Sequence, residues 1–369
     1  MTANEGVLGL SSIDSVSPAA AEDAAAYEIG VLDDAGMASW DAFVERCAQA
    51  TFFHKAGWRT VIEKSFGQRC RFLKATRAGE IRGVLPLVLV RSKLFGTRWV
   101  ATGWCVGGST AVDEPGAAIA LDRAAQALLA DSAADYIEYR DPANPHTDGT
   151  WQAKEGIYAG FERIIEADED ACLKQIPRKQ RAVVRKAIDS NLVDRVDGDL
   201  ASFYRLYSLS MRNLGTPVFS RRYIRTLLEV FGSDADILTV YQDERPLASV
   251  LNFYFRDRVM PYYTGADPEA RRVGAADLMY FRVMRRASER GYRIFDFGRS
   301  KLGTGPHAFK KNWGFEPRPV IHEFFLKAGA AMPDVNPNNP KYQRKIEAWK
   351  RLPLPVANLI GPWFGRQVG

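Results

Sequence analysis

Residues 296–315 include side chains that can move a proton and stabilise an anion. Asp296 follows an apolar run, and His307 and Lys310 follow a loop that contains two glycines. Asp296 and His307 are candidate general bases, because a carboxylate or an imidazole can accept the proton of an attacking amine. A positioned ammonium such as that of Lys310 can stabilise a negative charge that develops during a reaction. Structural roles stay open as alternatives: a hydrogen-bonded buried carboxylate, a surface-loop histidine and a solvated lysine.

Three further residues are candidates for binding the acceptor substrate. Arg299 and Ser300 follow the Asp296-Phe297-Gly298 run, where they can orient a polar acceptor. Tyr263 lies on the preceding strand predicted by the sequence and can line the same cleft. Core packing is the alternative role for this tyrosine.

The segment RRVGAA at 271–276 has the composition of a phosphate-binding loop. It separates a predicted strand from a predicted helix. Gly274 and Ala276 are small enough for the backbone to approach a ligand, and the N–H groups at a helix start attract phosphate oxygens. Arg271 and Arg272 add positive charge. We therefore expect these four residues to bind the phosphates of a donor; an ordinary basic loop is the alternative.

The second half of the chain repeats the plan of the first. Residues 79–140 read as a turn, two strands, an apolar helix and a final strand, and residues 243–299 follow the same order. The nearly constant offset predicts two copies of one domain of the α/β (α+β) class, each with a mixed, twisted sheet flanked by helices. The segment DEPG at 113–116 corresponds to the basic segment 271–276, but it is acidic and would repel phosphate. The donor site is therefore expected in the second copy.

The composition pattern divides the chain into four regions. We expect a disordered leader at 1–25, an N-terminal domain at 26–155, a C-terminal domain with the donor site at 156–330, and a tail rich in proline and apolar residues at 331–369. Within the second domain, the pattern at 169–191 predicts one helix.

The composition of the 369 residues limits the classes of function. A hydrophobic content of 46% with 25% charged residues is typical of globular proteins, and the net charge of +6 favours anionic partners. The scattered cysteines and histidines argue against a metal site and against a disulfide framework. The sequence shows neither a signal-peptide pattern nor a run of about 20 apolar residues, which predicts a cytoplasmic location.

Two segments suggest surfaces rather than catalytic groups. Residues 350–364 combine apolar residues and a tryptophan with flanking basic residues. This pattern fits a peripheral membrane contact, at the inner face of the membrane, or a segment docked on the protein core. The basic stretch 174–186 could track RNA, but this hypothesis rests on charge alone and ranks last, and no DNA partner is expected.

Several of these motifs resemble known families. Residues 271–276 resemble the Arg/Gln-x-x-Gly-x-Gly/Ala pyrophosphate loop of the GNAT acyltransferases, which bind acyl-CoA. The duplicated plan, DFGRS at 296–300, FKKNWG at 309–314 and the basic run at 176–181 resemble the FemAB family, over roughly residues 35–365. FemAB proteins are tandem GNAT-fold proteins whose best-known members transfer an amino acid from aminoacyl-tRNA to a peptidoglycan precursor amine. Similar sequences also include FemAB-like proteins of exosortase (PEP-CTERM) and exopolysaccharide loci.

The resemblance implies a function and one more site residue. In FemAB transferases a Phe-Lys pair is held to contact the donor and the reaction centre, which adds Phe309 to the substrate-binding candidates. The predicted reaction transfers an acyl or aminoacyl group from acyl-CoA or aminoacyl-tRNA, used as a substrate rather than a resident cofactor. The predicted acceptor is an amine of a cell-envelope or exopolysaccharide precursor. The alternative is a catalytically inactive GNAT-fold binding module in a polysaccharide or protein-sorting assembly.

Overall fold

The computed structural model describes residues 26–333 and 340–369. The predicted leader at 1–25 lies outside the described residues, as does part of the predicted tail.

The first half of the chain supplies the following elements: β1 (Glu28–Val31), α2 (Met37–Arg46), η1 (Phe52–His54), α3 (Gly57–Phe66), β2 (Arg69–Arg77), β3 (Glu80–Ser92), β4 (Gly96–Ala101), β5 (Ala111–Val112), α4 (Pro115–Ala130), β6 (Tyr136–Arg140) and β7 (Gln152–Ile164). The second half supplies these: α5 (Glu169–Gln175), α6 (Arg178–Ile188), β8 (Val193–Val196), α7 (Leu200–Leu214), α8 (Arg221–Phe231), η2 (Gly232–Asp234), β9 (Ala235–Gln242), β10 (Arg245–Phe255), β11 (Arg258–Ala266), α9 (Ala270–Val273), α10 (Ala275–Glu289), β12 (Ile294–Lys301), α11 (Gly305–Asn312) and β13 (Pro317–Leu326). Two helices follow: α12 (Pro340–Lys350) and α13 (Leu354–Val368).

The strands form one continuous mixed sheet whose order reflects the duplication. The order is β1-β2-β3-β4-β6-β13-β7-β12-β11-β10-β9-β8, and β5 pairs with β3. Read from the two edges inward, β2, β3, β4 and β6 occupy the same positions as β9, β10, β11 and β12. This arrangement confirms the predicted tandem architecture of mixed α/β units.

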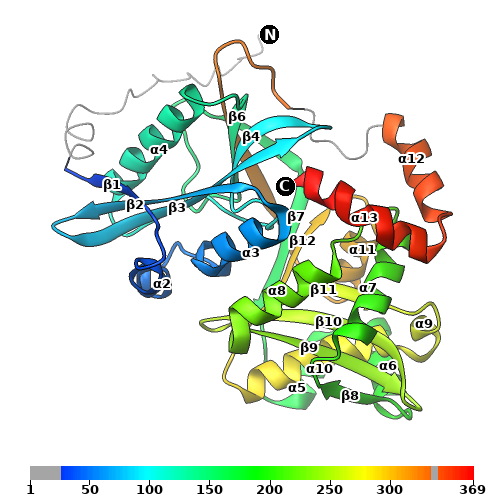
Figure 1. Cartoon of the computed structure of the whole chain (residues 1–369). Coiled ribbons are helices and arrows are strands. Elements are labelled where there is room, and N and C mark those ends of the chain that lie inside the picture. The colour runs from blue at the N-terminus through cyan, green and yellow to red at the C-terminus, as the bar shows by residue number, and fades with distance from the viewer. Residues whose placement is uncertain (1–25, 334–339) are drawn as a thin grey trace, which may run out of the picture.

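The last strand of each half lies against the other half (Figure 1). Strand β7 pairs with β12, where Ile164 lies opposite Ile294, and β13 pairs with β6, where His322 lies opposite Arg140. Strands β7 and β13 also pair with each other at the centre of the sheet. The predicted boundary between positions 155 and 156 therefore falls inside β7, and the two predicted sheets are joined into one.

Side-chain packing also joins the two halves. Phe52 of the first half stacks on Phe253 of the second with ring centroids 4.5 Å apart, and the rings of Trp58 and Phe231 lie 5.0 Å apart. These four side chains belong to one hydrophobic core that contains residues from both halves. Large buried aromatic side chains contribute strongly to stability, so this core fixes the two halves relative to each other.

The predicted single helix at 169–191 is wrong. Helix α5 ends at Gln175 and α6 begins at Arg178, with Pro177 between them. Proline has no N–H group to donate, and it disfavours helical backbone at the residue before it. The break turns the basic helix α6 toward α10, where Gln180 donates to Asp277.

The described part of the predicted tail is largely helical. The small residues Ala357, Gly361 and Gly365 form the buried side of α13. A Cβ atom added to Gly361 would lie 2.9 Å from a Val218 methyl group, so only glycine permits this close approach. Helix α13 is therefore docked on the protein, as one of the two predicted alternatives requires. No helix in residues 26–333 and 340–369 is long and apolar enough to cross a membrane.

Candidate active site

Each half contains a pair of parallel strands that separate after a short paired stretch. Strands β11 and β12 pair only at Arg258–Ile294 and Val259–Phe295, and β4 and β6 pair only at Trp99–Ile137 and Val100–Glu138. Where parallel strands diverge, their main-chain groups lose their ladder partners and become available to other groups.

In the first half, the end of α13 covers this divergence. Trp104 donates to the Gly365 carbonyl at 3.0 Å, and Arg98 donates to the Val368 carbonyl at 2.7 Å. Arg140, at the end of β6, donates to the Gly369 carbonyl at 2.8 Å. The divergence of the first half is therefore filled by the chain itself.

In the second half, β12 bulges just after its paired stretch. The register with β7 shifts between Asp296 and Arg299, and Gly298 has φ +63°, a conformation that favours glycine. Asp296 supports the turn, because its carboxylate accepts the Gly298 N–H at 2.8 Å. The DFG run is therefore the site of a shaped bulge rather than a regular strand end.

Lys310, predicted to be catalytic, holds this bulge from α11. Its buried ammonium donates to the carbonyls of Phe297 at 2.5 Å, Gly298 at 3.2 Å and Arg299 at 3.2 Å. These bonds use the three N–H groups of the ammonium. Burial lowers the pKa of Lys310 to about 7, and the nearby Asp296 carboxylate opposes this effect. In this geometry the Lys310 ammonium contacts the β12 backbone, and its catalytic role stays a prediction.

The two candidate bases have different surroundings near the bulge. Burial raises the pKa of the Asp296 carboxyl, while the Arg258 guanidinium, 3.3 Å away, lowers it. The His307 ring meets Phe161 edge to face at 5.5 Å, and its buried Nε2 has no hydrogen-bond partner among the described residues. The Lys310 ammonium also lies near Phe161, 5.4 Å from the centre of its ring. The structure thus brings Asp296, His307 and Lys310 together.

Phe309 belongs to an aromatic cluster beneath α10. Its ring lies 5.7 Å from Tyr280, 6.2 Å from Phe297 and 6.1 Å from Trp313. The Tyr280 hydroxyl donates to Thr264 of β11, so this cluster connects the two diverging strands. Phe309 and Lys310 both lie beside the Phe297 ring, Phe309 within the aromatic cluster and Lys310 with its ammonium on the β12 carbonyls.

The predicted phosphate-binding loop connects β11 to α10 through α9. Gly274 has φ +71°, and a Cβ atom there would lie 3.1 Å from Val183 of α6. The Arg271 and Arg272 side chains are exposed, and within the described part of the chain no carboxylate pairs with them. Ala276 lies at the second position of α10, half-buried. The loop therefore places two unpaired guanidinium groups beside a helix start.

Arg299 joins a buried polar network that the sequence did not predict. It donates to His322 Nε2 at 2.8 Å, so Nδ1 carries the imidazole hydrogen and donates to Glu138 at 3.0 Å. Glu138 in turn accepts two hydrogen bonds from Arg140. Burial lowers the pKa of His322, which keeps the ring neutral. Although burial opposes it, the Arg140 guanidinium holds the pKa of Glu138 well below its usual range.

The remaining substrate-binding candidates take separate positions. The Tyr263 hydroxyl shares a hydrogen bond of 3.0 Å with Tyr223, on the face of the sheet where the two halves meet. Ser300 is buried on β12, opposite Ala159 of β7. The contacts of Tyr263 and Ser300 therefore differ from those of Phe309.

Part of the missed network had a signal in the sequence. Glu138 and Arg140 alternate along a strand, which places them on one face, and Glu138 occupies the position that corresponds to Asp296 in the repeat. The contribution of His322 had no such signal, because β13 comes from the opposite half. No three His, Cys, Asp or Glu side chains are grouped to hold a metal ion within the ranges that the structure describes.

The chain is similar to known proteins in sequence and in fold. Residues 171–311 match the family model "Acetyltransferase (GNAT) domain". No curated protein sequence matches the chain. Among solved structures, FemX superposes with a TM-score of 0.66 at 18% identity, covering 86% of this chain and 99% of FemX. A tandem GNAT protein from the clavulanic acid biosynthesis pathway gives 0.51 at 14% identity, covering 84% of this chain and 100% of that chain.

A third neighbour is the DUF2156 C-terminal domain of an Agrobacterium fabrum protein described as a lysylphosphatidylglycerol synthetase. Its TM-score is 0.54 at 13% identity, covering 84% of this chain and 94% of that domain. Together with the divergent strands of both halves, these similarities confirm the predicted tandem fold. Residues 171–311 therefore match a GNAT domain, and the chain shares the tandem fold of FemX.

Proposed function

We propose that this protein transfers an acyl or aminoacyl group from a phosphorylated carrier to an amine of a cell-envelope or exopolysaccharide precursor. The observation that carries the proposal is the asymmetry of the two halves. The divergence of β4 and β6 is covered by α13, whereas the divergence of β11 and β12 is followed by an exposed arginine pair at a helix start. A donor phosphate can be held at that helix start by charge and by free N–H groups.

The donor phosphates would lie at residues 271–276, with the acyl carbonyl beside the β12 bulge. The acceptor nitrogen attacks the carbonyl carbon, and the tetrahedral oxyanion then collapses. The carbonyl–sulfur bond of a CoA thioester, or the carbonyl–oxygen bond of an aminoacyl ester, breaks and the leaving group takes a proton. Asp296 suits the role of proton acceptor for the amine, because its raised pKa makes it a stronger base than an ordinary aspartate. Among donors we favour a CoA thioester, since the basic loop resembles a pyrophosphate site.

A matched pair of double variants tests the donor site. We expect Arg271→Ala/Arg272→Ala to weaken binding of acetyl-CoA at least tenfold, because charge-assisted hydrogen bonds contribute about 1.5–3 kcal/mol each. Titration calorimetry with acetyl-CoA, and separately with charged tRNA, measures the effect. The control is Arg221→Ala/Arg222→Ala, which removes a second exposed arginine pair at the start of α8. Equal weakening by both double variants would show general charge attraction and contradict a specific donor loop.

The alternative function is a GNAT-fold binding module without turnover. The engagement of all three Lys310 N–H groups by main-chain carbonyls favours this alternative. Incubation with acetyl-CoA and an amine acceptor distinguishes the two: tight donor binding without release of free CoA thiol supports the module.

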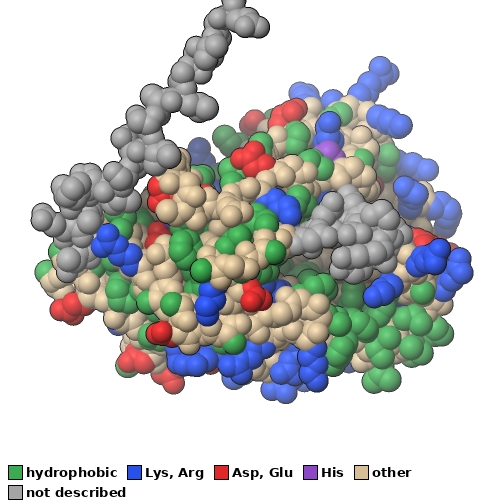
Figure 2. Space-filling view, turned by 90° about the horizontal axis from the view of Figure 1, so that it is seen from above, with side chains coloured by type: hydrophobic (Ala, Val, Ile, Leu, Met, Phe, Trp, Pro, Cys, Tyr) green, Lys and Arg blue, Asp and Glu red, His purple; other side chains and the backbone are tan. Residues whose placement is uncertain are grey.

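A peripheral membrane contact through α13 is part of the proposal, consistent with a lipid-linked acceptor. Docking by small residues leaves Val356, Leu359 and Trp363 on the outer side of the helix, with exposures of 41%, 80% and 48%. Figure 2 shows hydrophobic side chains gathered at the lower right, on the side where Figure 1 draws α13, with basic side chains above them. Apolar side chains beside basic ones are typical of helices that lie in a membrane interface.

Flotation with anionic vesicles tests this contact. We expect Leu359→Glu/Trp363→Glu to lower the bound fraction at least fivefold, because each large apolar side chain contributes about 1.5–3 kcal/mol when it leaves water. Leu214→Glu, at another exposed leucine, serves as the control. Unchanged flotation of the double variant would exclude α13 as the contact.

A further inference from the structure

A hollow of about 390 Å³ lies on the first half of the protein, away from the divergence of β11 and β12. Strands β2, β3 and β4 form one wall, and the end of α4 with the residues after it forms the other. The lining residues are Arg69, Arg71, Leu89, Arg91, Thr97, Trp99, Leu128, Asp131, Ser132 and Ala133.

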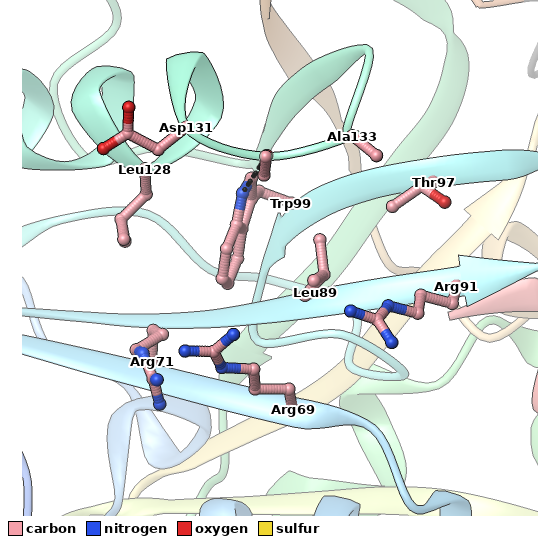
Figure 3. Close-up of a pocket in the computed structure, with 10 residues that line it drawn as sticks. Arg69, Arg71, Leu89, Arg91, Thr97, Trp99, Leu128, Asp131 and Ala133 are labelled. Carbon is pink, nitrogen blue, oxygen red and sulfur yellow. Dashed lines mark hydrogen bonds between the residues drawn. The ribbon is translucent and has the colours of Figure 1, made fainter.

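The strand register gathers three arginines in this hollow. Arg69 and Arg71 are two positions apart on β2 and therefore share a face of the sheet. Leu89 lies opposite Arg69, and Arg91, two residues further along β3, shares the same face and lies opposite Thr97. Figure 3 shows the Arg69 and Arg71 guanidinium groups below Trp99, with the Arg91 side chain extending toward Arg69.

The three positive charges have no ion-pair partner among the residues that the structure describes, although Arg71 donates to the Cys70 carbonyl at 3.2 Å. Within residues 26–333 and 340–369, no carboxylate forms an ion pair with Arg69, Arg71 or Arg91. Asp131 also lines the hollow, but Figure 3 shows its carboxylate on the far side from the arginines. Because like charges repel, three guanidinium groups on one face are best stabilised by an anion between them.

The opposite wall has a different chemical character. Helix α4 ends at Ala130, where Lys327 donates to the Ala130 and Ser132 carbonyls, and the Asp131 carboxylate gives this wall a negative group. The indole N–H of Trp99, on β4, donates to Ser132 at 3.1 Å and so links the two walls. Leu128 adds apolar surface to this wall, and Leu89 adds it to the strand wall. A ligand that fits both walls has an anionic group at one end and hydroxyl or amino donors at the other.

We propose that this hollow binds a small phosphate ester of a hydroxylated or amino-bearing compound, such as a sugar phosphate. The phosphate lies among Arg69, Arg71 and Arg91, and the hydroxyl or amino groups donate toward the Asp131 carboxylate. An RNA backbone needs an extended basic track, whereas here the charges converge on one small hollow. The site lies in the first half and does not depend on the proposed transfer reaction.

The test uses the full chain and two simple probes, inorganic phosphate and glucose 1-phosphate, in calorimetric titrations at low salt. Glucose 1-phosphate is expected to bind more tightly than inorganic phosphate, because only the ester reaches the α4 wall. Arg71→Ala is expected to weaken both at least tenfold, since it removes charge-assisted hydrogen bonds. Arg91→Ala, at an exposed position, provides a second variant if Arg71→Ala folds poorly. The control is Arg225→Ala, which removes one exposed arginine from α8.

Weakening by Arg71→Ala and Arg91→Ala, with no effect of Arg225→Ala, supports the site. Three outcomes overturn it. The first is the absence of binding by either probe at millimolar concentration. The second is equal weakening by the Arg225→Ala control. The third is Arg71-dependent binding of a 12-nucleotide RNA that glucose 1-phosphate does not displace, which would indicate an RNA contact instead.

Discussion

Replacement of Lys310 by methionine is expected to lower the rate of acyl transfer about 100-fold while destabilising the fold by only about 1–3 kcal/mol. The variant loses hydrogen bonds to the Phe297, Gly298 and Arg299 carbonyls, each of which is worth about 1.5–3 kcal/mol for a charged donor. It also avoids the burial of a charge whose pKa is lowered from 10.5 to about 7, which corresponds to about 5 kcal/mol. These opposing effects largely cancel in stability, but the bulge loses the contacts that shape it. The rate follows from single-turnover transfer, and stability follows from urea unfolding.

The neighbouring lysine provides the control for this result. Lys311→Met removes the same charge from an exposed position, so transfer and unfolding should stay near those of the parent protein. Amide hydrogen exchange at residues 298–300 separates two roles of Lys310. Faster exchange in Lys310→Met indicates a positioning role, whereas unchanged exchange with a lower rate indicates direct charge stabilisation. Equal losses of rate in Lys310→Met and Lys311→Met would contradict both roles.

Glu138→Ala is expected to destabilise the protein by about 3–5 kcal/mol, the largest stability effect that we predict. Its carboxylate is buried between Arg140 and His322, and removal leaves a buried guanidinium without its counter-charge. The pKa of Glu138 lies well below 4.5 in the folded state. Its contribution is therefore fully present above about pH 4.5 and is lost only as the pH falls through the folded-state pKa. Urea unfolding of the parent protein and of Glu138→Ala, at pH 7 and at pH 4, measures the loss of stability and its dependence on pH.

Glu162→Ala is the matched control for the loss of a strand glutamate. Glu162 pairs with Arg258 at 2.6 Å, but its side chain is exposed, so its removal should change stability by less than about 1 kcal/mol. If Glu138→Ala unfolds at the same urea concentration as the parent protein, the buried network contributes no net stability.

The duplication was predictable because the same local sequence patterns occur in both halves. Turn, strand and helix signals recur in the same order in both halves. Short-range periodicity of apolar residues is the most direct signal of secondary structure in a sequence. The same logic placed residues 271–276 between a strand and a helix, but β12 continues through the DFGRS run to Lys301. Placement of Asp296, His307 and Lys310 around one bulge follows from their closeness along the chain.

The network around Glu138 was not predictable in the same way. His322 reaches it only because β13 crosses into the other half, and such long-range pairing leaves no periodic signal. The role of Lys310 was also hidden, since a lysine beside Lys311 on a short helix reads as solvated. In the tail, Pro362 argues against a helix, yet α13 forms because its glycines permit close packing on Val218.

The exchange of β7 and β13 makes each half dependent on the other for its closing strand. If the polypeptide were split in the segment between β7 and α5, each fragment would carry the strand that pairs with its counterpart. Each fragment alone would expose unpaired strand edges and would tend to aggregate, while the two co-expressed fragments could complement each other. A gene that encodes such a reciprocal pair is difficult to shorten, because loss of either copy also removes a strand from the sheet of the copy that remains.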